Sequence, residues 1–233
     1  MKSIVFVDLE VHATKHTVLD IGATNDRGSV LHSPSMRDLA KFLQGHDYLC
    51  GHNILAHDLK YMKEALKEVP ALRWNIIDTL YLSPLLFPKK PYHSLGKNEK
   101  LQSEALNNPH TDALKAKELL EDEVLAFTRL DERLKIIYYE LLTGRNEFAA
   151  FFRYIDYATK TCDLVQLINE YYAGLICQRA NLATLISTEP VAVAYALAVI
   201  NVRDRFSVTP PWVLKQYPVV DYERPGRQPR EKR

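Results

Sequence analysis

The pattern of apolar and polar residues changes along the chain, and the first stretch predicts β-structure. Apolar residues near the N-terminus come in short runs that alternate with polar ones, which is typical of strands. We expect strands at residues 3–8, 16–23 and 28–32. The gaps between them are too short for a helix, and turn-forming residues at 25–28 separate the last two. These three strands are therefore predicted to form an antiparallel meander.

After Pro34 the pattern alternates between helical spacing and short apolar strands. We expect strands at 47–50 and 74–78, and the helices predicted around them span 36–44, 54–68 and 79–87. Such alternation is typical of parallel strands joined by crossover helices. The predicted fold class is α/β, with a mixed sheet that begins as an antiparallel meander, continues with parallel strands and is flanked by helices.

The second half of the chain predicts helices. Residues 88–108 are rich in Pro, Lys and Asn and are expected to be irregular, whereas helical spacing resumes at 110–127. From residue 131 to about 204 the apolar segments again have helical spacing, and we interpret their many aromatic residues as core. The expected parts are a sheet domain at 1–128, a C-terminal all-α subdomain at 129–206, and a linker with a disordered tail at 207–233.

Composition narrows the class of protein only slightly. Hydrophobic residues make up 47% and charged residues 25% of the chain, as in ordinary globular proteins, and the net charge of +1 does not require a polyanionic partner. The three cysteines form no CxxC pair, which favours a reducing compartment. We find no membrane-length apolar stretch and no signal-peptide pattern, so we expect a cytoplasmic protein without a membrane partner. The absence of GxxxxGK[ST] excludes a helicase motor.

Four acidic residues are the candidates for chemistry. Asp8 and Glu10 lie two positions apart in an apolar strand, so their side chains project from one face about 7 Å apart. Asp58 and Asp112 lie near the starts of two predicted helices, and each acid taken alone has an ordinary structural explanation. If all four converge, their mutual repulsion favours binding of two hard divalent cations, and oxygen ligands select Mg²⁺ or Mn²⁺.

Two further polar residues are interpreted as structural. Asn53 is the expected N-cap of the helix at 54–68, and Asp78 is expected to cap the helix that begins at Thr79.

The segments FVDLE, GHN with the following HD, and DALKAKELL resemble the three motifs of the DEDD superfamily of 3′–5′ exonucleases. The resemblance covers roughly residues 1–127 and implies a DnaQ-like, ribonuclease H-like fold. More narrowly, GHNILAHDLKYM and TPPWVLKQYP resemble the N-terminal exonuclease-like region of bacterial RecQ-type helicase polypeptides, which implies a helicase as partner or parent polypeptide.

The family resemblance also implies an activity. It is the metal-dependent hydrolysis of single-stranded or frayed nucleic acid from the 3′ end, releasing nucleoside 5′-monophosphates, with a role in DNA repair. We expect DNA rather than RNA as partner, although no motif reports on the 2′ position. In this scheme Asp8, Glu10 and Asp112 share one metal ion, Asp8 also binds a second, and Asp58 acts through a bridging water.

The general base of the family is the point of departure. Its histidine or tyrosine positions are occupied here by Asn107 and Asn108. His110 is included in the catalytic set as a substitute, and His93 is a second candidate, whereas His57 is interpreted only as a phosphate contact. The alternative hypothesis is a catalytically weakened or inactive nucleic-acid-binding module that keeps the metal site.

Overall fold

The computed structural model describes residues 2–90, 93–95, 108–177 and 180–202. It divides into two compact units that interleave along the chain. The sheet unit comprises Met1–Leu82, Ser94–Thr128 and Arg145–Ala158, and the helical unit comprises Ser83–His93, Arg129–Gly144 and Thr159–Arg233. The domain ranges expected from the sequence are contiguous, whereas this division groups residues 145–158 with the sheet. The expected tail at 207–233 lies outside the described residues.

The sheet unit is built on five strands in the order β3-β2-β1-β4-β5. Their bounds are β1 Ile4–Val11, β2 Val18–Asn25, β3 Val30–His32, β4 Tyr48–Gly51 and β5 Ile76–Asp78. The first three pair antiparallel, whereas β4 pairs parallel with both β1 and β5. The predicted mixed sheet, a meander followed by parallel strands, is confirmed.

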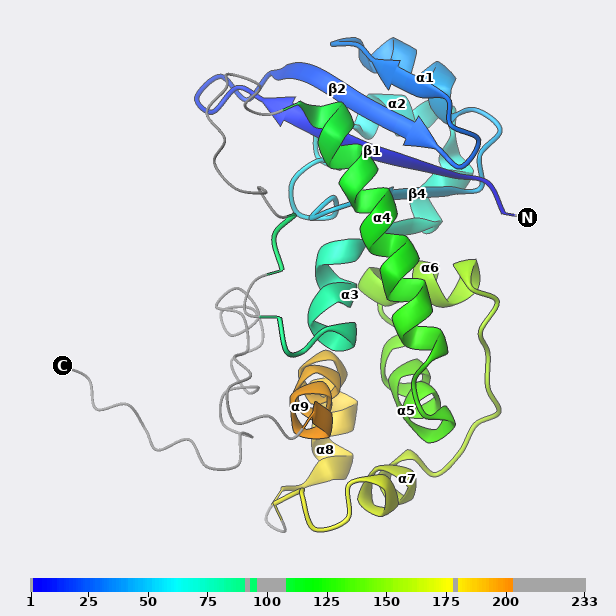
Figure 1. Cartoon of the computed structure of the whole chain (residues 1–233), viewed down its shortest axis with the longest axis vertical. Helices are drawn as coiled ribbons and strands as arrows, with labels where there is room; N and C mark the ends of the chain where they lie inside the picture. The colour runs from blue at the N-terminus through cyan, green and yellow to red at the C-terminus, as the bar shows by residue number, and fades with distance from the viewer. Residues whose placement is uncertain (1, 91–92, 96–107, 178–179, 203–233) are drawn as a thin grey trace, which may run out of the picture. The chain divides into compact units, whose positions relative to one another are not determined.

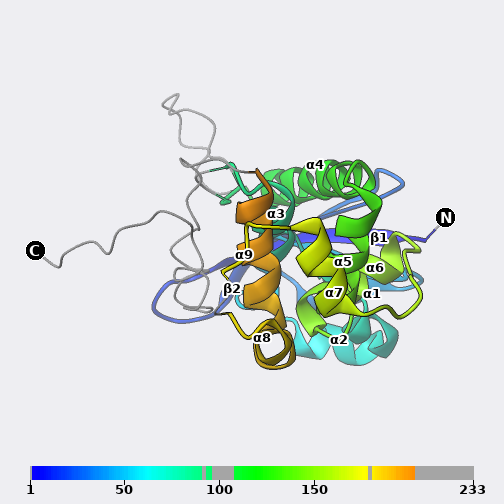
Figure 2. The ribbon, with the colours of Figure 1, turned by 90° about the horizontal axis from the view of Figure 1, so that it is seen from below.

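Strand β1 separates an apolar face from an acidic one. Val5, Val7 and Leu9 belong to a core that also includes buried residues of helices α1 (Met36–Leu43) and α2 (Lys63–Glu68). Because side chains alternate along a strand, Asp8 and Glu10 project from the opposite face. Helix α4 (Pro109–Thr128) crosses that face, with β1 between it and the pair α1 and α2 (Figures 1 and 2). The two carboxylates of β1 therefore lie on the α4 side of the sheet.

Aromatic packing attaches α6 (Asn146–Tyr154) to the sheet unit. The ring of Phe127 in α4 makes edge contacts with Phe151 and Phe152 of α6, at centroid distances of 5.7 and 5.8 Å. All three side chains are buried, and α6 also packs against β5. The interpretation of these aromatic residues as core is confirmed.

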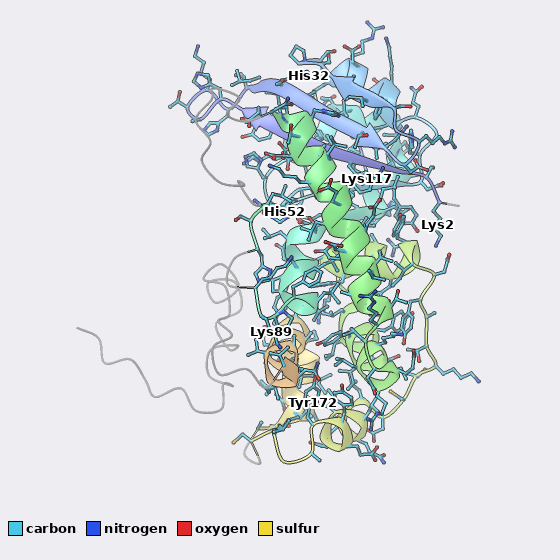
Figure 3. The ribbon with its side chains drawn as sticks, viewed as in Figure 1. Lys2, His32, His52, Lys89, Lys117 and Tyr172 are labelled. Carbon is cyan, nitrogen blue, oxygen red and sulfur yellow. The ribbon has the colours of Figure 1, made fainter. Side chains whose placement is uncertain are left out.

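The described part of the helical unit contains four complete helices besides the end of α3 (Thr79–Leu86), namely α5 Glu132–Leu142, α7 Leu164–Tyr171, α8 Leu182–Thr188 and α9 Pro190–Val202. Helix α9 is apolar and buried on nearly every side, and the Tyr172 hydroxyl, labelled in Figure 3, donates to the carbonyl of Leu197 at 3.1 Å. Helix α8 was not expected from the sequence. None of the described helices is long and apolar enough to cross a membrane.

The helix predicted at 54–68 is wrong over its first half. Residues 54–61 form successive hydrogen-bonded turns, α2 begins only at Lys63, and a short 3-10 helix follows at Pro70–Trp74. Asn53 is not an N-cap, because it has a left-handed φ of 63° and its N–H donates to the carboxylate of Asp78 at 2.8 Å. A bond to a distant strand end therefore sets the backbone here, and local helical spacing does not.

Candidate metal centre

The first two acids of the site are fixed by strand pairing. Asp8 lies directly opposite Gly22 in the antiparallel pair of β1 and β2, and Glu10 lies opposite Asp20. Directly opposed residues point to the same face, so Gly22 occupies the face of the sheet on which the Asp8 carboxylate lies. Both acids are partly buried.

Gly22 allows helix α4 to begin immediately above Asp8. A Cβ atom at Gly22 would lie 2.0 Å from the His110 backbone nitrogen and 2.1 Å from the Pro109 carbonyl carbon. Only a residue without a side chain fits such a contact. The start of α4 is thereby held against the strand position opposite Asp8.

Local sequence explains why α4 begins there. The side-chain oxygen of Asn108 accepts a hydrogen bond from the N–H of His110 at 3.0 Å, and Pro109 follows at the first helical position. Asp112 comes one turn after this cap, and its carboxylate forms an ion pair with Lys115 at 2.8 Å. Asn108 is therefore a helix cap, which accounts for an amide side chain at this position.

The turns between β4 and α2 carry Asp58. Its carboxylate is buried and accepts a hydrogen bond from the backbone of Leu9, which places it against β1 between Asp8 and Glu10 in the sequence of that strand. The ring nitrogen Nδ1 of His57 lies 3.1 Å from Asp58 Oδ1. At the start of the segment His52, labelled in Figure 3, hydrogen bonds through its ring with the Thr79 hydroxyl at 2.9 Å.

Asp78 holds this turn segment in place. Its two carboxylate oxygens accept from the backbone N–H groups of Asn53 at 2.8 Å, Leu55 at 3.0 Å and Leu80 at 3.0 Å. The bond from Leu80 confirms the predicted cap of α3. The other two bonds were not foreseen, and they connect the end of β5 to the segment that carries Asp58.

The four acids interact at Asp8. The pKa of Asp8 is raised to about 7, first by burial and then by the negative charges of Asp58, Asp112 and Glu10, whereas His57 lowers it. The pKa of Asp58 is also raised to about 7, chiefly by burial, against the lowering effect of the hydrogen bond from Leu9. The structure therefore brings the four predicted acids from β1, the turn segment and α4 into one electrostatically coupled group.

The donor chemistry of this group suits a hard divalent cation, because all four side chains offer carboxylate oxygens. A cation would also relieve the repulsion that raises the pKa of Asp8. Across the described ranges, however, no three His, Cys, Asp or Glu side chains are positioned to ligate a single ion. Asp112 pairs with Lys115 and Asp58 with Leu9 and His57, so some of these contacts would change on ligation.

The structure distinguishes the candidate histidines. His57 contacts Asp58 and lowers the pKa of Asp8, so it lies beside the acidic group. From the sequence alone it is interpreted only as a phosphate contact, outside the catalytic set. His110 stands in the first turn of α4, and its Nε2 atom is buried without a hydrogen-bond partner among the described residues. Its catalytic role stays a prediction.

The remaining base candidate belongs to the other unit. The ring of His93 is buried and its Nδ1 atom hydrogen bonds with the Ser83 hydroxyl at 2.8 Å, within the helical unit. Burial lowers the pKa of His93 to about 4. Asn107 lies outside the described residues.

Comparisons of the chain with protein-family models, with curated proteins and with solved structures gave no match.

Proposed function

We propose that the chain is a divalent-metal-dependent 3′–5′ exonuclease with a ribonuclease H-like sheet unit, acting on single-stranded or frayed nucleic acid, with DNA as the expected substrate. The observation that supports it is the coupling of four carboxylates around Asp8, from a strand, a turn segment and a helix of one compact unit. Carboxylates gathered from separate segments in this way are costly unless a cation offsets their charge.

Asp8, Glu10 and Asp112 would hold one Mg²⁺ or Mn²⁺ ion, with Asp8 shared by a second and Asp58 acting through a water. Such ions, when bound, supply a water of lowered pKa and offset negative charge on the phosphate. Asp58 is buried, and its carboxylate accepts a hydrogen bond from the backbone of Leu9, so the position of this acid is well fixed. Asp112 is about one-third exposed, and it forms an ion pair with Lys115, one turn along the same helix, so its side chain can reorient.

Among the histidines that the structure describes, His57 is the best placed for proton transfer in this proposal. When Asp58 is ionised its carboxylate only accepts hydrogen bonds, so Nδ1 of a neutral His57 then donates to Asp58 and leaves the lone pair on Nε2. The imidazole is about half exposed, which allows Nε2 to reach water or substrate. His57 would thus take the role that the family resemblance led us to assign to His110.

The test combines metal binding with turnover. We expect calorimetry to detect Mn²⁺ binding to the wild type, and a 3′-extended DNA duplex labelled at its 5′ end to be shortened stepwise in the presence of Mn²⁺ or Mg²⁺. Asp8→Asn should weaken both, with turnover falling about 10³-fold or more, because it removes the carboxylate at which the others interact. Glu64→Gln, an exposed acid on α2, is the matched control and should behave as the wild type.

Two results would contradict the proposal. One is a wild-type protein that binds no divalent cation, and the other is cleavage that persists undiminished in Asp8→Asn.

A second candidate is a binding module without turnover. It is favoured by Asn108, which serves as a helix cap in a region where the family carries a base. This candidate predicts Mn²⁺ and oligonucleotide binding by the wild type without cleavage, and cleavage only after Asn107→His.

A further inference from the structure

Two lysines among the described residues act on acids of the group: Lys60 lowers the pKa of Asp58, and Lys115 forms an ion pair with Asp112. The ammonium group of Lys115 is 2.8 Å from Asp112 Oδ1, one helical turn along α4, and both side chains are about one-third exposed. Asp112 is also one of the three acids that raise the pKa of Asp8. Lys115 therefore neutralises the acid of the group that comes from α4.

This ion pair is easily broken. Partly exposed pairs at i,i+3 on a helix contribute little to stability, because water screens the charges and two long side chains must be ordered. The pair also engages one oxygen of the acid that the metal site requires, and no three donors among the described residues are positioned for one ion. Breaking the pair therefore costs little and makes Asp112 available as a ligand.

We propose that Lys115 is an exchangeable internal counter-ion, which holds Asp112 when no metal is bound and is displaced from it by the divalent cation. The role rests on the proposed function, because it requires Asp112 to be a metal ligand. Lys115 is thus a positioning residue that sets the metal affinity of the site through Asp112.

The exchange predicts a gain of affinity on mutation. Removing Lys115 removes both the competitor for Asp112 and a positive charge close to the bound cation. We expect Lys115→Gln to bind Mn²⁺ about threefold to tenfold more tightly than the wild type in calorimetric titrations at low ionic strength. Lys115→Arg keeps the charge and should bind as the wild type does.

Two controls separate competition for Asp112 from a general change of charge. Lys117 lies two residues further along α4 (Figure 3), about 200° around the helix, and has no ion pair among the described residues. Lys117→Gln should change Mn²⁺ affinity less than about twofold, since its charge lies on another side of the helix. In an Asp112→Asn background, Lys115→Gln should raise Mn²⁺ affinity less than it does in the wild-type background, because only the loss of a positive charge remains once the shared partner has been removed.

The outcomes distinguish this inference from the proposed function. Failure of the wild type to bind Mn²⁺ overturns both. Wild-type binding that Lys115→Gln weakens or leaves unchanged, or that Lys117→Gln strengthens equally, overturns the counter-ion role and leaves the proposed metal site standing. Circular dichroism of each variant verifies that the helix content is preserved.

Discussion

Asp8 in β1 is partly buried and Asp78 at the end of β5 is buried, and both have a raised pKa, but their surroundings differ. The pKa of Asp78 is raised to about 6 by burial, while three backbone N–H groups lower it. The pKa of Asp8 is raised to about 7 by burial and by three other acids, whereas His57 lowers it. The surroundings of Asp78 supply hydrogen-bond donors, whereas those of Asp8 supply further negative charge.

The difference separates an acid whose hydrogen bonds stabilise the fold from one that we propose to be functional. The carboxylate of Asp78 accepts hydrogen bonds from the backbone of Asn53 and Leu55, which follow β4, and of Leu80, which follows β5. These bonds stabilise the local fold. Asp8 lies among three other negatively charged side chains, and the sheet unit does not fully compensate their charge. Such a group of acids favours binding of an external cation. The variants below contrast the two, from the largest expected effect to the smallest.

The largest effect should come from the histidine beside the Asp8 group. His57→Gln removes the imidazole that contacts Asp58, and we expect turnover of a labelled oligonucleotide to fall about 10²-fold or more. His110→Gln should lower turnover less than about tenfold. A larger loss in His110→Gln than in His57→Gln would restore His110 as the base and remove His57 from that role.

Asp78→Ala should mainly destabilise the fold. It leaves three backbone N–H groups of the turn segment and α3 without their acceptor, and we expect the free energy of unfolding to fall by about 2–4 kcal/mol in urea titrations. Asp8→Ala should change it by less than about 1 kcal/mol in the absence of metal. Equal losses for the two variants would remove the distinction between them.

Gly22→Ala should disturb the site through α4. The added methyl group meets the backbone of Pro109 and His110, so the start of the helix must move, at a cost of about 1–3 kcal/mol in unfolding free energy. Because Asp112 lies in the same helical turn, Mn²⁺ affinity should also fall. Gly144→Ala is the control, since no heavy atom of the described residues beyond its chain neighbours lies within 4 Å of the added Cβ.

The smallest effect should be a dependence of metal-free stability on pH. The pKa of Asp8 is about 7 in the folded protein against 3.8 for an ordinary aspartate, so its favourable contribution is complete below pH 3.8 and is lost as the pH rises to about 7. Asp8→Asn does not titrate. The free energy of unfolding of this variant relative to that of the wild type should therefore increase between pH 4 and 7 in EDTA, and urea titrations at each pH measure the increase. A constant difference across this range would show that Asp8 is not under repulsion.

Much of the sheet could be predicted from apolar spacing alone. The two-residue alternation of β1 placed Val5, Val7 and Leu9 on one face and Asp8 and Glu10 on the other, because strand geometry depends only on local backbone conformation. The helix predicted at 54–68 was wrong over residues 54–61 because distant contacts, and not local backbone conformation, decide the structure there. Its helical spacing was overridden because the carboxylate of Asp78, 25 and 23 residues further along the chain, accepts hydrogen bonds from the backbone of Asn53 and Leu55.

The candidate site, like the sheet, could be predicted from the sequence only in part. The acids themselves were visible in the sequence, and so was the HD dipeptide that now draws attention to His57. Two other features could not be predicted from the spacing of residues. They are the contact of Gly22 with the start of α4 and the ion pair of Lys115 with Asp112.

The sequence by itself determined which residues could carry charge and which face of each strand would be apolar, because these depend on side-chain chemistry and backbone period. Only the tertiary structure decided that Asp58 and Asp112 interact with Asp8, that His57 contacts Asp58, and that the carboxylate of Asp78 is hydrogen bonded to the backbone while its charge also raises the pKa of Asp58. Electrostatic coupling and burial depend on distances between segments remote in the chain, and those distances exist only once the sheet and α4 have packed together.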